Sequence, residues 1–480
     1  MVRLLVSARH AAPTILLLLS LAVPAAAAEQ APRSAAVSSL EDALLRTWRS
    51  NPDIQAQRAQ VRAVREAEPQ ARAGLLPQVS ATAYAGVLAT RSLLRGTPIN
   101  IATSDTLGQR GVALTATQTL FDGWRTQNSI VQAERLTAAK RQQLRATEQS
   151  MLLDVATTFI AVRTGLALVE VQRKNVDFLT TTLATIRTRL AAGVATPTDV
   201  TQAEARLARG IADLNAVQAD LVIARDRFAK LVGAPAGERL RPTPVVDRLL
   251  PASRDIARDK AGHDNPAVLA AAEAVKAADA AVRAAQGQML PQVGVQGQAA
   301  RDYDTDSSTR RVDSLQVVGR VTVPLYAGGG PEAQVRQNRE LVGVALLQLD
   351  SARLQARSAA YGARVGLDTA GIAIRAASEE VRAGEATVEG IRRQLEQGIR
   401  TVTELLNAQQ DAVAARARLA QATGDRAVAA FTLLAAVGRL GLNDLGIRAK
   451  PLAEPQPPPD MQVRFDSWRD LRTVPPLIAR

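Results

Sequence analysis

Residue types that could carry out catalytic or metal chemistry are scarce in this chain of 480 residues. It has no cysteine, which excludes disulfides, cysteine nucleophiles and histidine–cysteine metal clusters. Of its two histidines, His10 lies in the N-terminal apolar segment, so a Ser–His–Asp site would have to use His263. His263 stands just before Asn265-Pro266, where we expect a loop ahead of a helix. The sequence therefore predicts no enzyme activity, no catalytic or metal site and no cofactor.

The N-terminus has the pattern of a secretory signal. Arg3 and Arg9 precede an apolar core over 15–23, and Ala26-Ala27-Ala28 forms an A-x-A cleavage site. The apolar core is about half the ~20 residues that a membrane-spanning helix needs, which argues against a permanent anchor. We therefore predict a signal peptide over 1–28 and a bacterial envelope protein.

Composition favours long helices and argues against nucleic-acid binding. The net charge is +13, but arginine is scattered among Glu, Asp and Gln along helix-like segments, as on a solvated helix surface. Aromatic residues are only 3% of the chain, which is low for a globular core and typical of long helices packed side by side. We expect no nucleic-acid partner.

The chain contains an internal repeat. Residues 51–86 align with 265–300 at an offset of 214, sharing Asn-Pro and the run LPQV. A second correspondence at an offset of 205 matches LFDG with LYAG, Gly193 with Gly398, and Asp199 with Glu404. A repeat of this length indicates a duplicated structural unit. We predict repeats over 39–238 and 253–445, followed by a Pro-rich tail over 446–480.

Each repeat is expected to contain a short helical region, two strands and a long helical hairpin. Apolar residues recur at helical spacing between Asp122, a candidate N-cap, and Gly193, with no proline. Period-two alternation predicts the strands. The expected helices are 40–49, 52–72, 122–193, 198–232, 266–287, 330–396 and 402–437, the strands are 76–86, 111–121, 290–299 and 315–326, and the strand loops are 91–109 and 301–314.

These strands suggest a transmembrane barrel. We find no segment after residue 30 apolar enough for a membrane-spanning helix, and a closed barrel is the other structure that spans a bilayer. The four strands alternate as barrel strands do, but the smallest barrels use eight, so several chains would have to share one barrel. The competing interpretation is a pair of soluble hairpins at the end of a helical rod.

Several segments together resemble the TolC family of outer-membrane efflux and secretion channels, over about 39–445. They are the duplicated NP…LPQV segments, the LFDG and LYAG junctions, and the turn sequences RLAAGVATPTDVTQAEARL (189–207) and QLEQGIRTVTELLNAQQ (394–410). The resemblance implies a mainly α fold with a small β part. It also implies a homotrimer with a 12-stranded barrel in the outer membrane and a long antiparallel coiled-coil tunnel across the periplasm.

The resemblance also implies site residues at the periplasmic end. Glu404 and Asn407 match the acids that line the family's narrow entrance, and Asn407 departs from that pattern, which halves the expected ring charge. Asp199 and Arg400 match an acid–base latch, and Leu395 replaces the tyrosine of that latch. The expected adaptor-docking tips are Gly193, Val194, Ala195, Thr196, Gly398, Ile399, Arg400 and Thr401.

The implied role is a passive exit duct, opened by partner docking. Its expected partners are a periplasmic adaptor (membrane fusion) protein, an inner-membrane transporter of the ABC or proton-driven kind, and outer-membrane lipid. Drug efflux and type I protein secretion both fit. A soluble periplasmic adaptor or structural coiled-coil protein is the alternative, although adaptors carry one helical hairpin and this chain has two.

Overall fold

The computed structural model describes residues 36–94, 101–243, 246–306 and 309–448, and the side chains of 92–94 and 101–104 are outside this description. The expected signal peptide over 1–28 and all but the first residues of the expected tail over 446–480 therefore lie outside the described residues.

The described chain is mainly helical, with one four-stranded sheet. In each half of the chain, short helices are followed by two strands and then by two long helices. The first half comprises α1 (Leu40–Ser50), α2 (Pro52–Arg65), α3 (Ala67–Arg72), η1 (Ala73–Leu75), β1 (Gln78–Leu94), β2 (Ile101–Phe121), α4 (Arg125–Ala191) and α5 (Pro197–Val232). The second half comprises η2 (Asp247–Leu249), α6 (Arg254–Asp264), α7 (Pro266–Gly287), β3 (Gln292–Tyr303), β4 (Arg311–Thr322), α8 (Gly330–Glu396) and α9 (Val402–Ala436).

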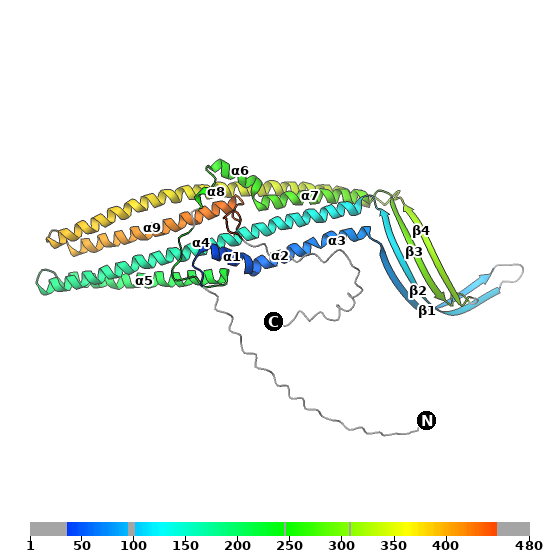
Figure 1. The fold of residues 1–480 in the computed structure, drawn as a ribbon, viewed down its shortest axis with the longest axis horizontal. Helices are drawn as coiled ribbons and strands as arrows, with labels where there is room; N and C mark the ends of the chain where they lie inside the picture. Colours follow the sequence, from blue (N-terminus) through cyan, green and yellow to red (C-terminus); the bar gives the residue numbers. More distant parts are fainter. Residues whose placement is uncertain (1–35, 95–100, 244–245, 307–308, 449–480) are drawn as a thin grey trace, which may run out of the picture. The chain divides into compact units, whose positions relative to one another are not determined.

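Four long helices form two antiparallel hairpins, α4 with α5 and α8 with α9, drawn side by side in Figure 1. Helices α4 and α8 have 67 residues each, or roughly 100 Å at 1.5 Å per residue. The main core lies where both hairpins meet α1 and α6, and Phe159, Phe228 and Phe431 are its largest buried side chains. The rings of Phe159 and Phe228 are 6.1 Å apart, so this cluster ties α4 to α5.

The strands form one antiparallel sheet in the order β1-β2-β3-β4. Tyr84 pairs with Gly111, which pairs in turn with Asp302, so the register runs unbroken across three strands at this level. A β-bulge at Leu120 shifts the pairing of β2 with β3 just before the chain enters α4. Among the described residues, strands β1 and β4 each have a partner strand on one side only.

The strand lengths correct the sequence prediction. The expected loop over 91–109 is largely strand, because β1 continues to Leu94 and β2 begins at Ile101. Cross-strand pairing supplies the backbone hydrogen bonds there, which overrides a composition rich in Gly, Ser, Thr and Asn. The expected strand over 315–326 is also shifted, since β4 covers Arg311–Thr322 and the LYAG segment follows it.

Three local expectations also change. Helix α4 begins at Arg125 rather than Asp122, although the Asp122 carboxylate still accepts the Thr126 N–H at 2.9 Å. His263 lies in the last turn of α6, not in a loop, and its side chain is exposed. One 18-residue window of α4 has a mean hydropathy of 1.7. By length and composition this window could cross a membrane, so the expectation that no segment after residue 30 is apolar enough to do so is wrong. Because α4 packs against α5, α7 and α9, that window belongs to a bundle helix.

Candidate functional site

The two long hairpins end in turns with the same backbone design. Gly193 and Gly398 have φ values of 75° and 77°, the left-handed conformation predicted for both. Val194 N–H bonds Arg189 O and Ile399 N–H bonds Gln394 O, each at 2.9 Å, as in a Schellman motif. The residues that follow the glycines, Val194 and Ile399, are 68% and 67% exposed. Each tip therefore presents one apolar side chain that its own chain leaves uncovered.

The left-handed conformation at the tips leads to a first prediction, for Gly398→Ala. A Cβ at this positive φ should destabilise the hairpin by about 1–2 kcal/mol, although nothing within 4 Å would contact it. The control is Gly390→Ala, near the end of α8 with equally open surroundings, where alanine should stabilise by about 0.5–1 kcal/mol. Chemical denaturation of both variants measures the difference, and equal effects would contradict a tip-specific strain.

Both returning helices begin with a capping box. At the start of α5, the Asp199 carboxylate accepts the Thr196 N–H at 2.9 Å, and Thr196 Oγ1 accepts the Asp199 N–H at 3.2 Å. At the start of α9, Glu404 and Thr401 make the same exchange at 2.8 and 3.3 Å. Reciprocal bonds of this kind satisfy two otherwise unpaired helix N–H groups. The acids Asp199 and Glu404 therefore have a local structural role at equivalent positions.

Glu404 is further engaged by Arg400. While one carboxylate oxygen caps α9, the other accepts from Arg400 Nη1 at 2.7 Å. The pKa of Glu404 is lowered, first by the hydrogen bond from the Thr401 N–H and then by Arg400. The carboxylate is therefore ionised but partly neutralised by a cation of its own chain.

A second prediction concerns pH. Because its folded pKa is below the ordinary value of 4.5, Glu404 stabilises the folded protein above pH 4.5, and this contribution is lost as the pH falls through the folded pKa. Thermal unfolding of Glu404→Gln beside the wild type should show a lower Tm for the variant at pH 7. The difference should vanish in acid. A difference unchanged down to about pH 3 would contradict the capping role of the ionised carboxylate.

The structure does not bring the two expected latch residues together within one chain. The Asp199 side chain bonds to Thr196, and Arg400 bonds to Glu404 and Gln394. At the position of the missing tyrosine, the main chain supplies a link, since the Leu395 carbonyl accepts from Arg189 Nη2 at 3.0 Å. This bond joins α8 to α4, and so connects the two hairpins near their tips.

Further contacts join the hairpins on the side of α5 and α9. An apolar cluster buries Leu179, Leu183, Ile186, Ala203, Val402 and Leu406, from α4, α5 and α9. Beside it, Arg206 donates to Asn407 Oδ1 at 2.8 Å and to Gln410, and Thr403 donates to Gln202 at 2.6 Å. Asn407, expected to line an entrance with Glu404, is therefore engaged by α5 of its own chain.

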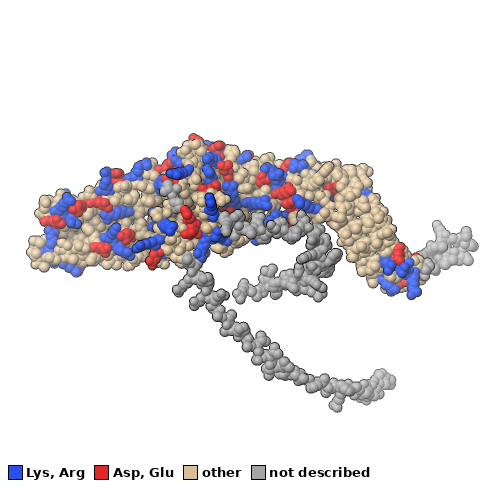
Figure 2. Space-filling model, viewed as in Figure 1, with Lys and Arg blue, Asp and Glu red and all other residues tan. Residues whose placement is uncertain are grey.

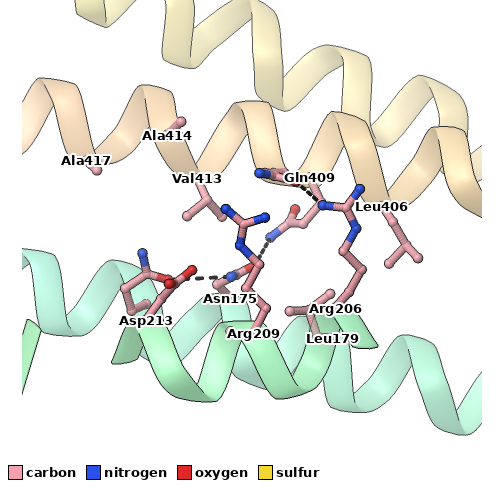
Figure 3. Close-up of a pocket in the computed structure, with 13 residues that line it drawn as sticks. Asn175, Leu179, Arg206, Arg209, Asp213, Leu406, Gln409, Val413, Ala414 and Ala417 are labelled. Carbon is pink, nitrogen blue, oxygen red and sulfur yellow. Dashed lines mark hydrogen bonds between the residues drawn. The ribbon is translucent and has the colours of Figure 1, made fainter. Parts of the chain in front are cut away.

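A cavity of about 180 Å³ lies between these helices. Figure 3 shows Arg206 and Arg209 rising from α5 toward α9, while Gln409 reaches Asn175 of α4 at 3.3 Å. Sequence reasoning missed this polar junction, because Arg206 and Asn407 are 201 residues apart and neither carries a local signature. The offset between the repeats makes α5 and α9 equivalent in sequence, but it does not predict that the two helices are in contact.

The sheet has one apolar and one polar face. Paired residues of antiparallel strands share a face, so the register assigns each side chain. The apolar face comprises Val79, Ala81, Ala83, Val87, Val112, Leu114, Ala116, Val293, Val295, Ala299, Leu315, Val317 and Val321. These side chains include some of the most exposed apolar residues of the described chain, such as Leu315 at 83% and Val317 at 74%.

The opposite face is mainly polar. It carries Ser80, Thr82, Thr115, Thr117, Gln292, Gln296, Gln298, Ser314 and Gln316, together with Leu88, Leu107, Val312 and Val318. Aromatic and charged residues bound the apolar face at its two ends. Phe121 and Trp124 are in edge-to-face contact near the helices, and the Arg110 guanidinium lies over the Tyr303 ring at the far end. Figure 2 shows the uncharged surface of the sheet ending in a group of charged side chains.

Comparisons with known proteins agree with this architecture. The family model described as "Outer membrane efflux protein" matches residues 44–234 and 257–439. The Outer membrane efflux protein BepC of Brucella suis is 32% identical over 445 residues, which cover 92% of this chain and 93% of BepC. The Alkaline protease secretion protein AprF of Pseudomonas aeruginosa is 27% identical over 274 residues, 54% of this chain and 55% of AprF.

The fold is also that of a solved outer membrane protein. The outer membrane protein VceC of Vibrio cholerae superposes with a TM-score of 0.69 at 18% identity, covering 83% of this chain and 96% of VceC. The alternative of a soluble adaptor with a single hairpin does not match this arrangement of two hairpins and a sheet. Because the family model matches both halves and BepC aligns over nearly the full length, the chain belongs to the outer membrane efflux protein family.

Proposed function

We propose that this protein is a homotrimeric outer-membrane channel that acts as the exit duct of a tripartite efflux pump or a type I secretion system. Three chains would close one 12-stranded barrel, and their long helices would form a 12-helix tunnel across the periplasm. The predicted repeats over 39–238 and 253–445 would each supply two strands and one long hairpin per chain, making the tunnel pseudo-sixfold. The duct is passive, and its opening is driven by partners.

The observation that carries this proposal is a sheet with one apolar and one polar face, whose outer strands β1 and β4 are each unpaired on one side. A sheet exposed to water on both sides has no reason to gather Val and Leu on one face, whereas a barrel in lipid requires it. The apolar row of β1 over 79–87 spans about 26 Å at ~3.3 Å per residue, or about 20 Å when tilted by ~40°. This is close to the ~25 Å apolar band of outer-membrane barrels. Pairing β1 of one chain with β4 of the next would remove both free edges.

The tips are proposed as the docking surface for a periplasmic adaptor. Val194 and Ile399 occupy the same position of two equivalent turns and are mostly exposed, as expected for apolar side chains that a partner covers. The adaptor would in turn engage an inner-membrane transporter, either an ABC or a proton-driven protein. The proposal includes both small drugs and secreted proteins as cargo, because one relative is named an efflux protein and another a protease secretion protein.

The Asp199–Arg400 latch stays a prediction, now as a contact between neighbouring chains. Both residues lie at the tips. To form the latch, Asp199 would give up its bond with Thr196 and Arg400 its bond with Glu404. Asp199→Lys should then raise single-channel conductance. Asp199→Asn is the control that keeps much of the capping geometry while removing the charge. Unchanged conductance in Asp199→Lys would discard the latch and leave the duct.

The experiment that tests the function is single-channel recording of the purified mature protein in a planar bilayer. Discrete openings from a protein that extracts from membranes as a trimer would support the proposal. A protein that stays soluble without detergent and never inserts would overturn it and favour the adaptor or rod. A vesicle flotation assay on the same sample separates failure to insert from insertion without current.

A further inference from the structure

We propose that Asp302, held by Tyr84 on the polar face of the sheet, is a cation-selecting residue at the outer end of the channel. The inference rests on the proposed function, because it takes the polar face as the barrel lumen. The sheet end that is farthest from the helices is then the extracellular end. Three chains would place three copies of Asp302 around this opening.

The residue pair is built across three strands. Tyr84 of β1, Gly111 of β2 and Asp302 of β3 stand opposite one another in the register. Tyr84 Oη donates to Asp302 Oδ1 at 2.9 Å, so the phenol ring crosses the intervening strand. This crossing requires Gly111, since a Cβ there would meet the Tyr84 ring at 2.7 Å. The three residues therefore hold the carboxylate in one place on the polar face.

Charge is distributed unequally between the two faces at this level. The side chains of Arg110, Arg301 and Arg311 belong to the apolar face, where Asp313 bonds both Arg301 and Arg311. On the polar face of the described strands, the charged residues are Asp105, Asp302 and Arg320. Arg320 pairs with Gly294, eight residues along the strand from the row of Asp302, or about 26 Å. No cation of the described strands therefore shares the polar face with Asp302 at its own level.

The dimensions allow Asp302 to affect ion passage. A 12-stranded barrel with strands ~4.8 Å apart and tilted by ~40° is roughly 24 Å across at the backbone. Three carboxylates projecting inward would be roughly 15 Å apart, comparable to the ~10 Å Debye length at 0.1 M salt. Rings of carboxylates favour cations. At the other end of the duct, Glu404 is paired with Arg400 and Asn407 replaces an acid, so the outer ring should supply much of the selectivity.

The test is the K⁺/Cl⁻ permeability ratio, measured from reversal potentials in a roughly tenfold KCl gradient at low salt. Asp302→Asn keeps an acceptor for Tyr84 and should lower the ratio at least twofold, and Asp302→Lys should bring it below one. Asp313→Asn makes the same change one row away on the opposite face and should leave the ratio unchanged. Glu404→Gln should change it less than Asp302→Asn. In a gradient of the same ratio at about 1 M KCl, the Debye length is near 3 Å and the charges are more strongly screened. The differences in permeability ratio between the wild type and the Asp302 variants should therefore shrink.

Asp302→Asn and Asp313→Asn are also recorded in a Leu406→Ala background. Removing this buried leucine from the cluster near the tips should widen the tip and give the sheet end a larger share of the electrical resistance. A conducting channel whose permeability ratio is unchanged by Asp302→Asn in both backgrounds would overturn this inference and leave the duct intact. A ratio lowered equally by Asp302→Asn and Asp313→Asn would also overturn it, because the effect would not depend on the face. A protein that stays soluble and never inserts would contradict the proposed function itself.

Discussion

Val317→Arg should abolish assembly of this protein in the outer membrane, whereas Val318→Arg should be tolerated. The two residues are neighbours in β4, but Val317 pairs with Gly297 on the apolar face and Val318 pairs with Gln296 on the polar face. An arginine facing lipid near the bilayer midplane costs about 2–4 kcal/mol, or roughly 6–12 kcal/mol for three chains. An arginine on the face that is proposed to line the water-filled lumen would avoid this cost.

The measurement is the fraction of protein recovered as a detergent-extracted trimer from outer membranes. We expect at least a tenfold loss for Val317→Arg and a near-normal yield for Val318→Arg, with reduced cation preference in the latter because it adds a cation to the lumen. Near-normal recovery of both variants would contradict the assignment of faces and with it the barrel. Loss of both would point to a general requirement for valine in β4.

Leu406→Ala should loosen the periplasmic tip and raise single-channel conductance severalfold. Leu406 is 2% exposed and packs with Leu179 and Leu183, so it joins α9 to α4 across the two hairpins. Replacing a buried leucine by alanine costs about 2–5 kcal/mol. Here the loss falls on the small cluster that, together with Arg206, Thr403 and Arg189, holds the hairpin ends together.

Leu434→Ala is the matched control, because Leu434 lies in the same helix, is 0% exposed and belongs to the main core. It should lower the free energy of unfolding by a similar amount without changing conductance, since the main core lies away from the tips. Conductance that rises equally in both variants would mean that general destabilisation, rather than the tip cluster, controls opening. Unchanged conductance in Leu406→Ala would assign closure to contacts between chains.

Local sequence predicted the presence and order of the helices and strands. The caps that the structure shows at Ser39, Asn51, Thr196 and Thr401 involve residues two or three positions away, and the alternation of β1 and β4 depends on every second residue. The left-handed turns at Gly193 and Gly398 follow from a single residue type in a helix-ending context. The Arg400–Glu404 pair also joins residues only four positions apart, with Arg400 just before the N-cap of α9.

By itself, then, the sequence determined the mainly helical fold and the order of elements, because periodicity and capping are local properties, and its motifs resembled those of one family of channels. Tertiary structure decided what these elements contact. It extended β1 and β2 through the segment expected as a loop, because pairing with another strand satisfies the backbone whatever the composition. It brought Arg206 to Asn407 and Tyr84 to Asp302, pairs 201 and 218 residues apart. Their meeting depends on helix packing and strand register, which are set by the whole chain rather than by either residue's neighbours.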